Sequence, residues 1–255
     1  VATRKKMVMM AAENAVAAGI TVLVSSGNDG YCDSIAWPSC ISSVVAVGAV
    51  YDAAFGQFSP CISSGSCLTT KIASGGCTTG YYCTDSTTAD LVTSYSNMAS
   101  TLGLLAPGNQ CYTLDISGAS GYGPDDYYAG FGGTSAACPY AAGAVACLQS
   151  AAKALTGSFL PVADVISRLT SYGDQVTDFR SGLTKPRVNL EQAIASLPNA
   201  GGPFRIYNDG TATLQVSSIV EESPVAWVRF SPVVPVVVPG GSFQDVTMVP
   251  VLDLA

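Results

Sequence analysis

The stretch that most constrains the fold of this chain runs from Gly132 to Ala146. It reads as a glycine pair, a Thr-Ser pair and then a run of small, mostly apolar residues. The glycines predict a tight turn that passes the chain into a helix, with Ser135 at the helix N-terminus and Pro139 in its first turn. Because the run leaves almost no polar face, we expect this helix to be buried.

Two polar residues occupy places where a chain can do acyl-transfer chemistry. Ser135 would lie where backbone N–H groups and the helix dipole favour developing negative charge. Asn28 lies in a glycine-rich turn after the apolar run 20–24, and its amide could donate a hydrogen bond to an oxyanion. Taken singly, each also has a plain explanation, because serine commonly caps helices and Asn-Asp-Gly commonly makes turns.

Composition excludes several classes of protein. The chain has 255 residues, of which 48% are hydrophobic and 11% charged, so it can bury a large core and is not of the disordered class. A formal net charge of −7 argues against a nucleic-acid partner. No uninterrupted run of 18 apolar residues occurs, so we expect no membrane span.

Nine cysteines point to an oxidising compartment and hence to secretion. Most lie in loop-like sequence, and we predict a disulfide between Cys32 and Cys40, which bracket a short loop; the other pairings stay open. Cys138 and Cys147 fall on the apolar helix and are expected to be inert buried thiols. The chain has no histidine and no paired Cys-x-x-Cys spacing, so we expect no zinc or other metal centre built from side chains.

The order of the apolar segments predicts an α/β fold with a parallel sheet. A helix over 3–18, a buried strand over 20–24 and another over 44–50 alternate in the manner of layered sheets, whose functional loops follow the strands. Residues 51–92 are rich in Ser, Thr, Gly and Cys and read as a disulfide-tied surface insertion. Core-like sequence returns at 94–97 and 104–108, and further helices are expected at 161–171 and 188–197.

The C-terminal part has a different texture. Residues 199–203 read as a linker, which gives two domains, 1–198 and 204–255. Within the second, 204–207 and 211–217 predict a strand, a turn and a strand. Short strands are also expected at 227–230, 233–238 and 244–249. These are fewer strands than an immunoglobulin-like sandwich needs, so the domain is expected to be a partial β-sandwich.

Taken together, these segments resemble the subtilisin-like serine peptidases, the subtilase family. The resemblance rests on the serine motif Gly133-Thr134-Ser135-Ala136-Ala137-Cys138-Pro139 with Ala142-Gly143, and on Ser25-Ser26-Gly27-Asn28-Asp29-Gly30 as an oxyanion-hole segment. Trp37-Pro38, Val44 to Val50, Ser94 to Asn97 and Ala106-Pro107-Gly108 match intervening segments in the right order. The resemblance covers roughly residues 1–198 and implies part of a three-layer subtilisin-like sheet with helices on both faces.

The resemblance also implies roles for individual residues. Ser135 would be the nucleophile, and the Asn28 side chain would join the Ser135 backbone N–H in stabilising the oxyanion. The substrate-binding set would comprise Ser25, Ser26, Gly27 and Thr134. Trp37–Pro38 would be a conformationally special peptide bond, with cis as a candidate form. No cofactor is needed for the chemistry, and a structural calcium ion on the carbonyls near Ser39, Ile41 and Val44 is an option.

The missing residues bear on function as much as those present. A serine hydroxyl needs a neighbouring base, and in this family the triad order is Asp, His, Ser. Both earlier members are therefore expected upstream of Val1 in the same protein, and the chain alone should be inactive. The predicted function is that of a secreted serine endopeptidase acting on polypeptides. The alternative is a non-catalytic scaffold or adhesion protein; an esterase with Gly-x-Ser-x-Gly is disfavoured because Ala137 stands at the second glycine.

Overall fold

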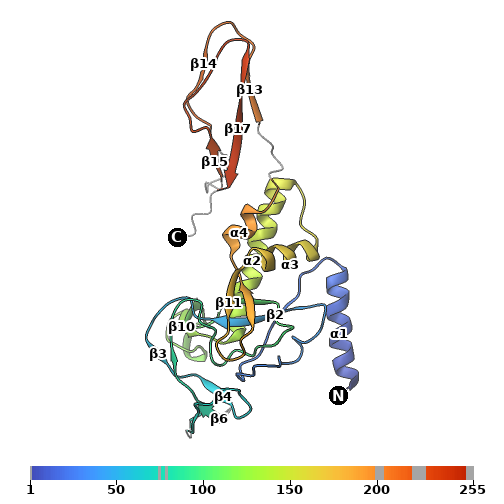
Figure 1. Cartoon of the computed structure of the whole chain (residues 1–255), viewed down its shortest axis with the longest axis vertical. Coiled ribbons are helices and arrows are strands. Elements are labelled where there is room, and N and C mark those ends of the chain that lie inside the picture. The colour runs from blue at the N-terminus through green and yellow to red at the C-terminus, as the bar shows by residue number, and fades with distance from the viewer. Residues whose placement is uncertain (1, 74–75, 78–79, 199–203, 220–227, 251–255) are drawn as a thin grey trace. The chain divides into compact units, whose positions relative to one another are not determined.

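The structure is a computed structural model, and it describes residues 2–73, 76–77, 80–198, 204–219 and 228–250 (Figure 1). The chain divides into two compact units, residues 1–148 with 161–190, and residues 149–160 with 191–255. The predicted linker 199–203 lies outside the described residues, and the domain boundary at 198 stays a prediction. In the described part of the chain, no helix combines the length and apolarity needed to cross a membrane.

A five-stranded sheet forms the centre of the first unit, in the order β1-β2-β8-β12-β11. β1, β2, β8 and β12 run parallel, and β11 is antiparallel to β12. The bounds are β1 Leu23–Ser25, β2 Val45–Val50, β8 Leu104–Pro107, β11 Asp174–Thr177 and β12 Thr184–Arg187. Every residue of β2 is buried, as a continuous apolar run predicts for a central parallel strand. The predicted α/β class with a parallel-rich sheet is confirmed.

The core of this unit joins the sheet to the segment that precedes β8. Its buried members are Ala46, Val50, Val92, Met98, Leu102, Leu105 and Val176. Met98 and Val92 are fully buried although they lie outside the regular strands. The segment 92–102 therefore contributes to the core, and its polar residues Thr93, Ser94, Ser96 and Asn97 are buried as well.

The helices are α1 Ala2–Ala17, α2 Thr134–Thr156, α3 Val162–Ser171 and α4 Leu190–Ala195, with a 3-10 turn at Gly118–Ser120. α1 ends before Gly19, whose φ of 87° suits a residue without a Cβ. α4 is shorter than the predicted span of 188–197. Pro139 lies in the second turn of α2, not in the first, because the helix already begins at Thr134.

α2 is buried along one stripe only, so the prediction of a wholly buried helix is wrong for the described structure. Ala137, Ala141 and Leu148 are fully buried, whereas Gly143 and Cys147 on the opposite stripe are exposed. Small apolar side chains allow a helix to be buried on every side, but burial also requires another element to pack against each side. The exposed position of Cys147 also corrects its prediction as a buried thiol, while Cys138 is half-buried and its pKa is raised by desolvation.

The segment between β2 and the core residue Val92 forms small antiparallel sheets, as expected of a surface insertion (Figure 1). The strands are β3 Gln57–Phe58, β4 Cys61–Ser63, β5 Ile72–Ala73, β6 Gly80–Tyr82 and β7 Asp85–Ser86. Disulfides join Cys32 to Cys67 and Cys61 to Cys77. The predicted Cys32–Cys40 pair is wrong, because the insertion folds back onto the loop after β1 and leaves Cys40 as an exposed thiol.

Cys83 is a buried thiol in this insertion, 3% exposed, and its Sγ faces the Pro60 carbonyl oxygen at 3.7 Å. Burial, with a contribution from Asp85, raises its pKa from 9.0 to about 11. Because the folded state holds this proton more tightly, the thiol's contribution to stability is complete below pH 9. It is lost as the pH rises from 9 to 11, by at most about 1.4 kcal/mol per pH unit.

We therefore expect the unfolding free energy of the wild-type chain to fall more steeply between pH 9 and 11 than that of Cys83→Ala. Urea titrations at several pH values would measure both slopes. Iodoacetamide should modify the exposed Cys40 and Cys147 in the folded chain and Cys83 only after unfolding. Equal slopes, or early modification of Cys83, would contradict the assignment.

The second unit contains two small antiparallel sheets, β13-β17-β15 and β14-β16. The bounds are β13 Phe204–Asn208, β14 Leu214–Val216, β15 Val228–Ser231, β16 Val236–Val238 and β17 Ser242–Pro250. The strands β13 and β14, predicted as a strand-turn-strand pair, belong to different sheets, because β13 pairs with β17 and β14 with β16. A β-sandwich is not shown, and Trp227 of one predicted strand lies outside the described residues.

Candidate active site

Ser135 is the second residue of α2 and its side chain is exposed. The chain reaches it through Gly133, which has a φ of 92° and donates its N–H to the Gly108 carbonyl oxygen at 2.8 Å. A Cβ at Gly133 would approach the Asn28 side chain to 3.0 Å. Glycine thus allows both the turn and the close approach of Asn28 to the start of the helix.

Asn28 follows β1, and its side chain is held by Thr134, the first residue of α2. Its Oδ1 accepts hydrogen bonds from the Thr134 backbone N–H at 2.8 Å and from the Thr134 hydroxyl at 2.9 Å. These two donors assign Oδ1 and Nδ2 of the amide, because in the flipped orientation the Nδ2 group would face the Thr134 N–H, donor against donor. The Nδ2 group is left as the donor side of the amide, and it lies 3.0 Å from where a Cβ at Gly133 would be, two residues before the exposed Ser135.

Thr134 is fully buried between the two segments. Besides bonding Asn28, its hydroxyl oxygen accepts a hydrogen bond from the Gly27 N–H at 3.2 Å. The side chain of this predicted substrate-binding residue therefore holds the turn before α2 to the loop after β1. A direct contact between Thr134 and a substrate stays a prediction.

The other predicted substrate-binding residues lie at the end of β1. Ser26 is fully buried, its N–H bonds the Val47 carbonyl oxygen and its own carbonyl accepts from Ala36 N–H, at 2.9 and 2.8 Å. Gly27 has a φ of 103°. At Ser26 and Gly27, a substrate could therefore contact mainly the backbone. Substrate binding by Ser25, Ser26 and Gly27 stays a prediction.

The start of α2 adds an electrostatic contribution. The first backbone N–H groups of a helix have no partner within it, and the aligned peptide dipoles favour negative charge there. The Ser135 N–H and the Asn28 Nδ2 therefore belong to a region suited to stabilising an oxyanion. The chain contains no histidine, which is the residue that most often activates a serine hydroxyl.

The carbonyl groups suggested for calcium lie in the turn around the Trp37–Pro38 peptide, which is cis as the resemblance suggested. The Ile41 carbonyl oxygen already accepts the Val44 N–H at 3.2 Å. Carbonyl oxygens suit calcium, but without a carboxylate they make a weak site, so calcium here stays a proposal. Within the described ranges, no group of three or more His, Cys, Asp or Glu residues could hold a metal ion.

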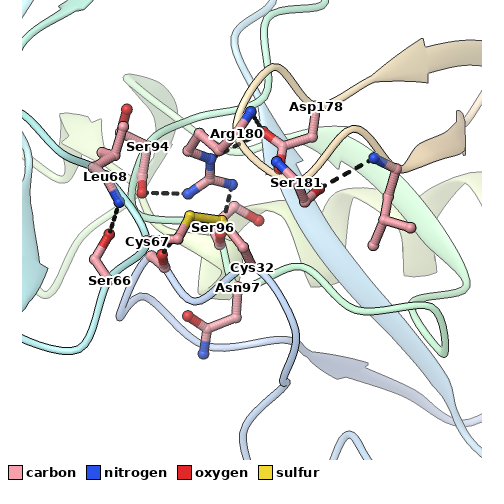
Figure 2. A network of polar contacts seen from close by, with 12 residues as sticks. Cys32, Ser66, Cys67, Leu68, Ser94, Ser96, Asn97, Asp178, Arg180 and Ser181 are labelled. Atoms are coloured by element: carbon pink, nitrogen blue, oxygen red, sulfur yellow. Dashed lines mark hydrogen bonds and ion pairs between the residues drawn. A yellow bond between two sulfur atoms is a disulfide. The ribbon is translucent and has the colours of Figure 1, made fainter.

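One polar network was not predicted from the sequence: a buried ion pair that binds the segment Ser94–Asn97 (Figure 2). Arg180 and Asp178 form a 2.9 Å ion pair with side chains 1% and 0% exposed. The guanidinium donates to the carbonyl oxygens of Ser94 at 2.6 Å and Ser96 at 2.9 Å, as the dashed lines in Figure 2 show. Their neighbour Asn97 is fully buried. Ser94–Asn97 matched a family segment, but Arg180 lies 86 residues from Ser94 and carried no local signal.

Replacing Arg180 by methionine should destabilise the chain by about 3 kcal/mol, because Asp178 would be left as a buried carboxylate without its cation. Arg187→Met is the matched control, since the Arg187 side chain is 26% exposed and pairs with the partly exposed Asp90 and Asp174. It should cost about 1 kcal/mol or less. Urea unfolding of both variants would test this, and equal losses would contradict a special role for the buried pair.

Most of the chain matches a known protein family. The family model described as "Subtilase family" matches residues 2–182. A solved structure of the prenylagaramide maturation protease PagA is 20% identical, with a TM-score of 0.47 over 71% of this chain and 51% of that one. The chain thus spans about half the length of that structure. No curated protein matches the chain. The family match extends over most of the chain and includes both the Asn28 loop and the Ser135 turn, and the chain therefore belongs to the subtilase family of serine peptidases.

Proposed function

We propose that the protein containing this chain is a serine endopeptidase that cleaves polypeptides through an acyl-enzyme on Ser135. The observation that carries the proposal is the fixed orientation of the Asn28 amide. Thr134 holds the amide oxygen at 2.8 and 2.9 Å, which leaves Nδ2 as a donor beside the Ser135 turn. Such a donor is useful where negative charge develops on a substrate carbonyl oxygen, and it has no comparable use in a plain turn.

The reaction would follow the sequence known for serine peptidases. Ser135 Oγ bonds to the substrate carbonyl carbon as its proton passes to a histidine, and the oxyanion is held by Asn28 Nδ2 and the Ser135 N–H. The C–N bond then breaks, and the amine leaves with that proton. Water next attacks the ester, gives a proton to the histidine and releases the acid, while Ser135 recovers its proton.

The histidine and its aspartate would come from an upstream segment of the same protein. Two features of the described structure support such a segment. The α2 stripe that includes Gly143 and Cys147 is apolar yet exposed, and β1 is an edge strand whose outer side has no partner among the described strands. Both are features that a further strand and covering layer would bury. Without the histidine and the aspartate, the chain alone is expected to be inactive.

Secretion is part of the proposal. The two disulfides, Cys32–Cys67 and Cys61–Cys77, are stable in an oxidising compartment. A secreted peptidase of this kind needs no cofactor for its chemistry, and a calcium ion would only stabilise the fold. The non-catalytic scaffold remains the alternative that the experiment must separate from the peptidase.

A serine-directed peptidyl phosphonate provides the test. The complete protein should be labelled, and mass mapping should place the adduct on Ser135, whereas this chain alone should not react because it lacks a base. An adduct on another serine would show that the nucleophile assignment is wrong. A complete protein that resists the reagent and cleaves no peptide would favour the scaffold.

A further inference from the structure

Asn97 uses its whole side chain to hold the loop that carries Asn28. Its Oδ1 accepts the backbone N–H groups of Asp29 at 3.0 Å and Tyr31 at 3.1 Å. Its Nδ2 donates to the Ser26 carbonyl oxygen at 3.2 Å and to Asp29 Oδ2 at 3.0 Å. These contacts lie on both sides of Asn28 in the chain, so one buried amide fixes the loop before and after the oxyanion donor.

The backbone of Asn97 adds to this grip. Its N–H donates to the Gly27 carbonyl oxygen at 3.0 Å. A Cβ at Gly27 would come within 2.5 Å of Asn97 Nδ2, so the two residues pack without room for a side chain between them. Asn97 therefore controls both the hydrogen bonding and the spacing of the loop.

Asn97 is itself held in place from below. Arg180 binds the carbonyl oxygens of Ser94 and Ser96, and the Ser96 Oγ accepts the N–H of Ala49 in β2 at 3.0 Å. Figure 2 shows the Arg180 fork reaching these carbonyl oxygens from its pair with Asp178. Through its neighbours Ser94 and Ser96, Asn97 is thus attached to the central sheet and to a buried ion pair. This makes it a rigid support for positioning another residue.

We propose that Asn97 is a positioning residue that sets where Asn28 Nδ2 points, an inference that rests on the proposed peptidase function. Thr134 fixes the Asn28 amide from its oxygen end, and Asn97 fixes the backbone from which that amide projects. A displaced donor meets the oxyanion poorly, and small misplacements at a reacting centre carry large rate penalties.

The principal test is a double-mutant cycle in the complete protein. Asn97→Ala should lower kcat by roughly 10 to 10²-fold with little change in KM. In an Asn28→Ala background the same substitution should have almost no further effect, because the donor that it positions is gone. Asn208→Ala is the matched control. That asparagine is 8% exposed and donates to the Ala212 and Val238 carbonyl oxygens, both at 2.8 Å, so it should leave kcat unchanged.

A second pair of variants guards against simple misfolding. Asn97→Asp keeps an oxygen for the N–H groups of Asp29 and Tyr31, but sets a carboxylate against Asp29 Oδ2. Activity should fall, and adding Asp29→Asn should restore part of it by removing the repulsion. A residue that only filled space would show no such recovery.

Hydrogen exchange tests directly, without any need for activity, whether Asn97 holds the backbone N–H groups of the Asn28 loop. The amide hydrogens of Asp29 and Tyr31 should exchange at least about tenfold faster in Asn97→Ala than in Asn208→Ala. Unchanged exchange, or additive effects of the Asn28 and Asn97 substitutions on kcat, would overturn the inference while leaving the peptidase intact. If Ser135 proves not to be the nucleophile, the peptidase proposal fails and the catalytic role of Asn97 fails with it.

Discussion

Replacing Ser135 by alanine in the complete protein is expected to lower kcat by about 10⁶-fold. The substitution removes the atom that would carry the acyl group, so no covalent intermediate can form. The magnitude is the one measured for loss of the nucleophile in subtilisin, another member of the family. Substrate binding should be almost unchanged, because the hydroxyl contributes little before the reaction begins.

Turnover of a chromogenic peptide would measure this loss, and phosphonate labelling should disappear with it. Ser150→Ala offers a matched control, since Ser150 is also an exposed serine of α2. It should leave both readings at the wild-type level. Equal labelling before and after Ser135→Ala would show that another residue is the nucleophile.

Replacing Asn28 should produce the next largest effect, a loss of about 10²–10³-fold in kcat. This is the penalty known for the oxyanion-hole asparagine of subtilisin, a relative within the family. KM should change little, because the Nδ2 donor acts most strongly when charge has developed on the oxyanion.

Two variants separate this role from a structural one. Asn28→Ala removes both the donor and the oxygen that accepts from Thr134, so it should lower both activity and stability. Asn28→Asp keeps that oxygen but replaces the donor by negative charge, and it should therefore reduce kcat at least as far while costing less stability. If Asn28→Asp retained wild-type kcat, the amide would not be the oxyanion donor.

The sequence was informative where local rules coincide with tertiary packing. The apolar runs predicted β2 and the helix α1 to within one residue of their observed bounds, because a buried parallel strand and a glycine-ended helix leave strong local patterns. The strand predicted over 20–24 overlaps β1 but begins three residues too early. Their order predicted the α/β class. The exposed stripe of α2 was missed, because a run of alanines permits burial on all sides but does not show what is present to cover it.

Long-range pairing was the other point of failure. Cys32 and Cys40 are near in sequence, but the insertion brings Cys67 to Cys32 instead, with their Cα atoms 5.9 Å apart. The same limit applies at the candidate site. Ser135 and Asn28 could be singled out by their local turns, whereas Arg180 acts through backbone carbonyls more than 80 residues away.

The Cys32–Cys67 and Cys61–Cys77 disulfides have a consequence for how this chain would respond to proteolytic cleavage. Their loops overlap between residues 61 and 67, so a single cut between Cys32 and Cys77 leaves the two pieces covalently joined. A nick between Cys32 and Cys77 would therefore be invisible on a non-reducing gel and would appear as two fragments only after reduction. The candidate oxyanion loop would stay covalently attached to the insertion through Cys32–Cys67 after such a cut.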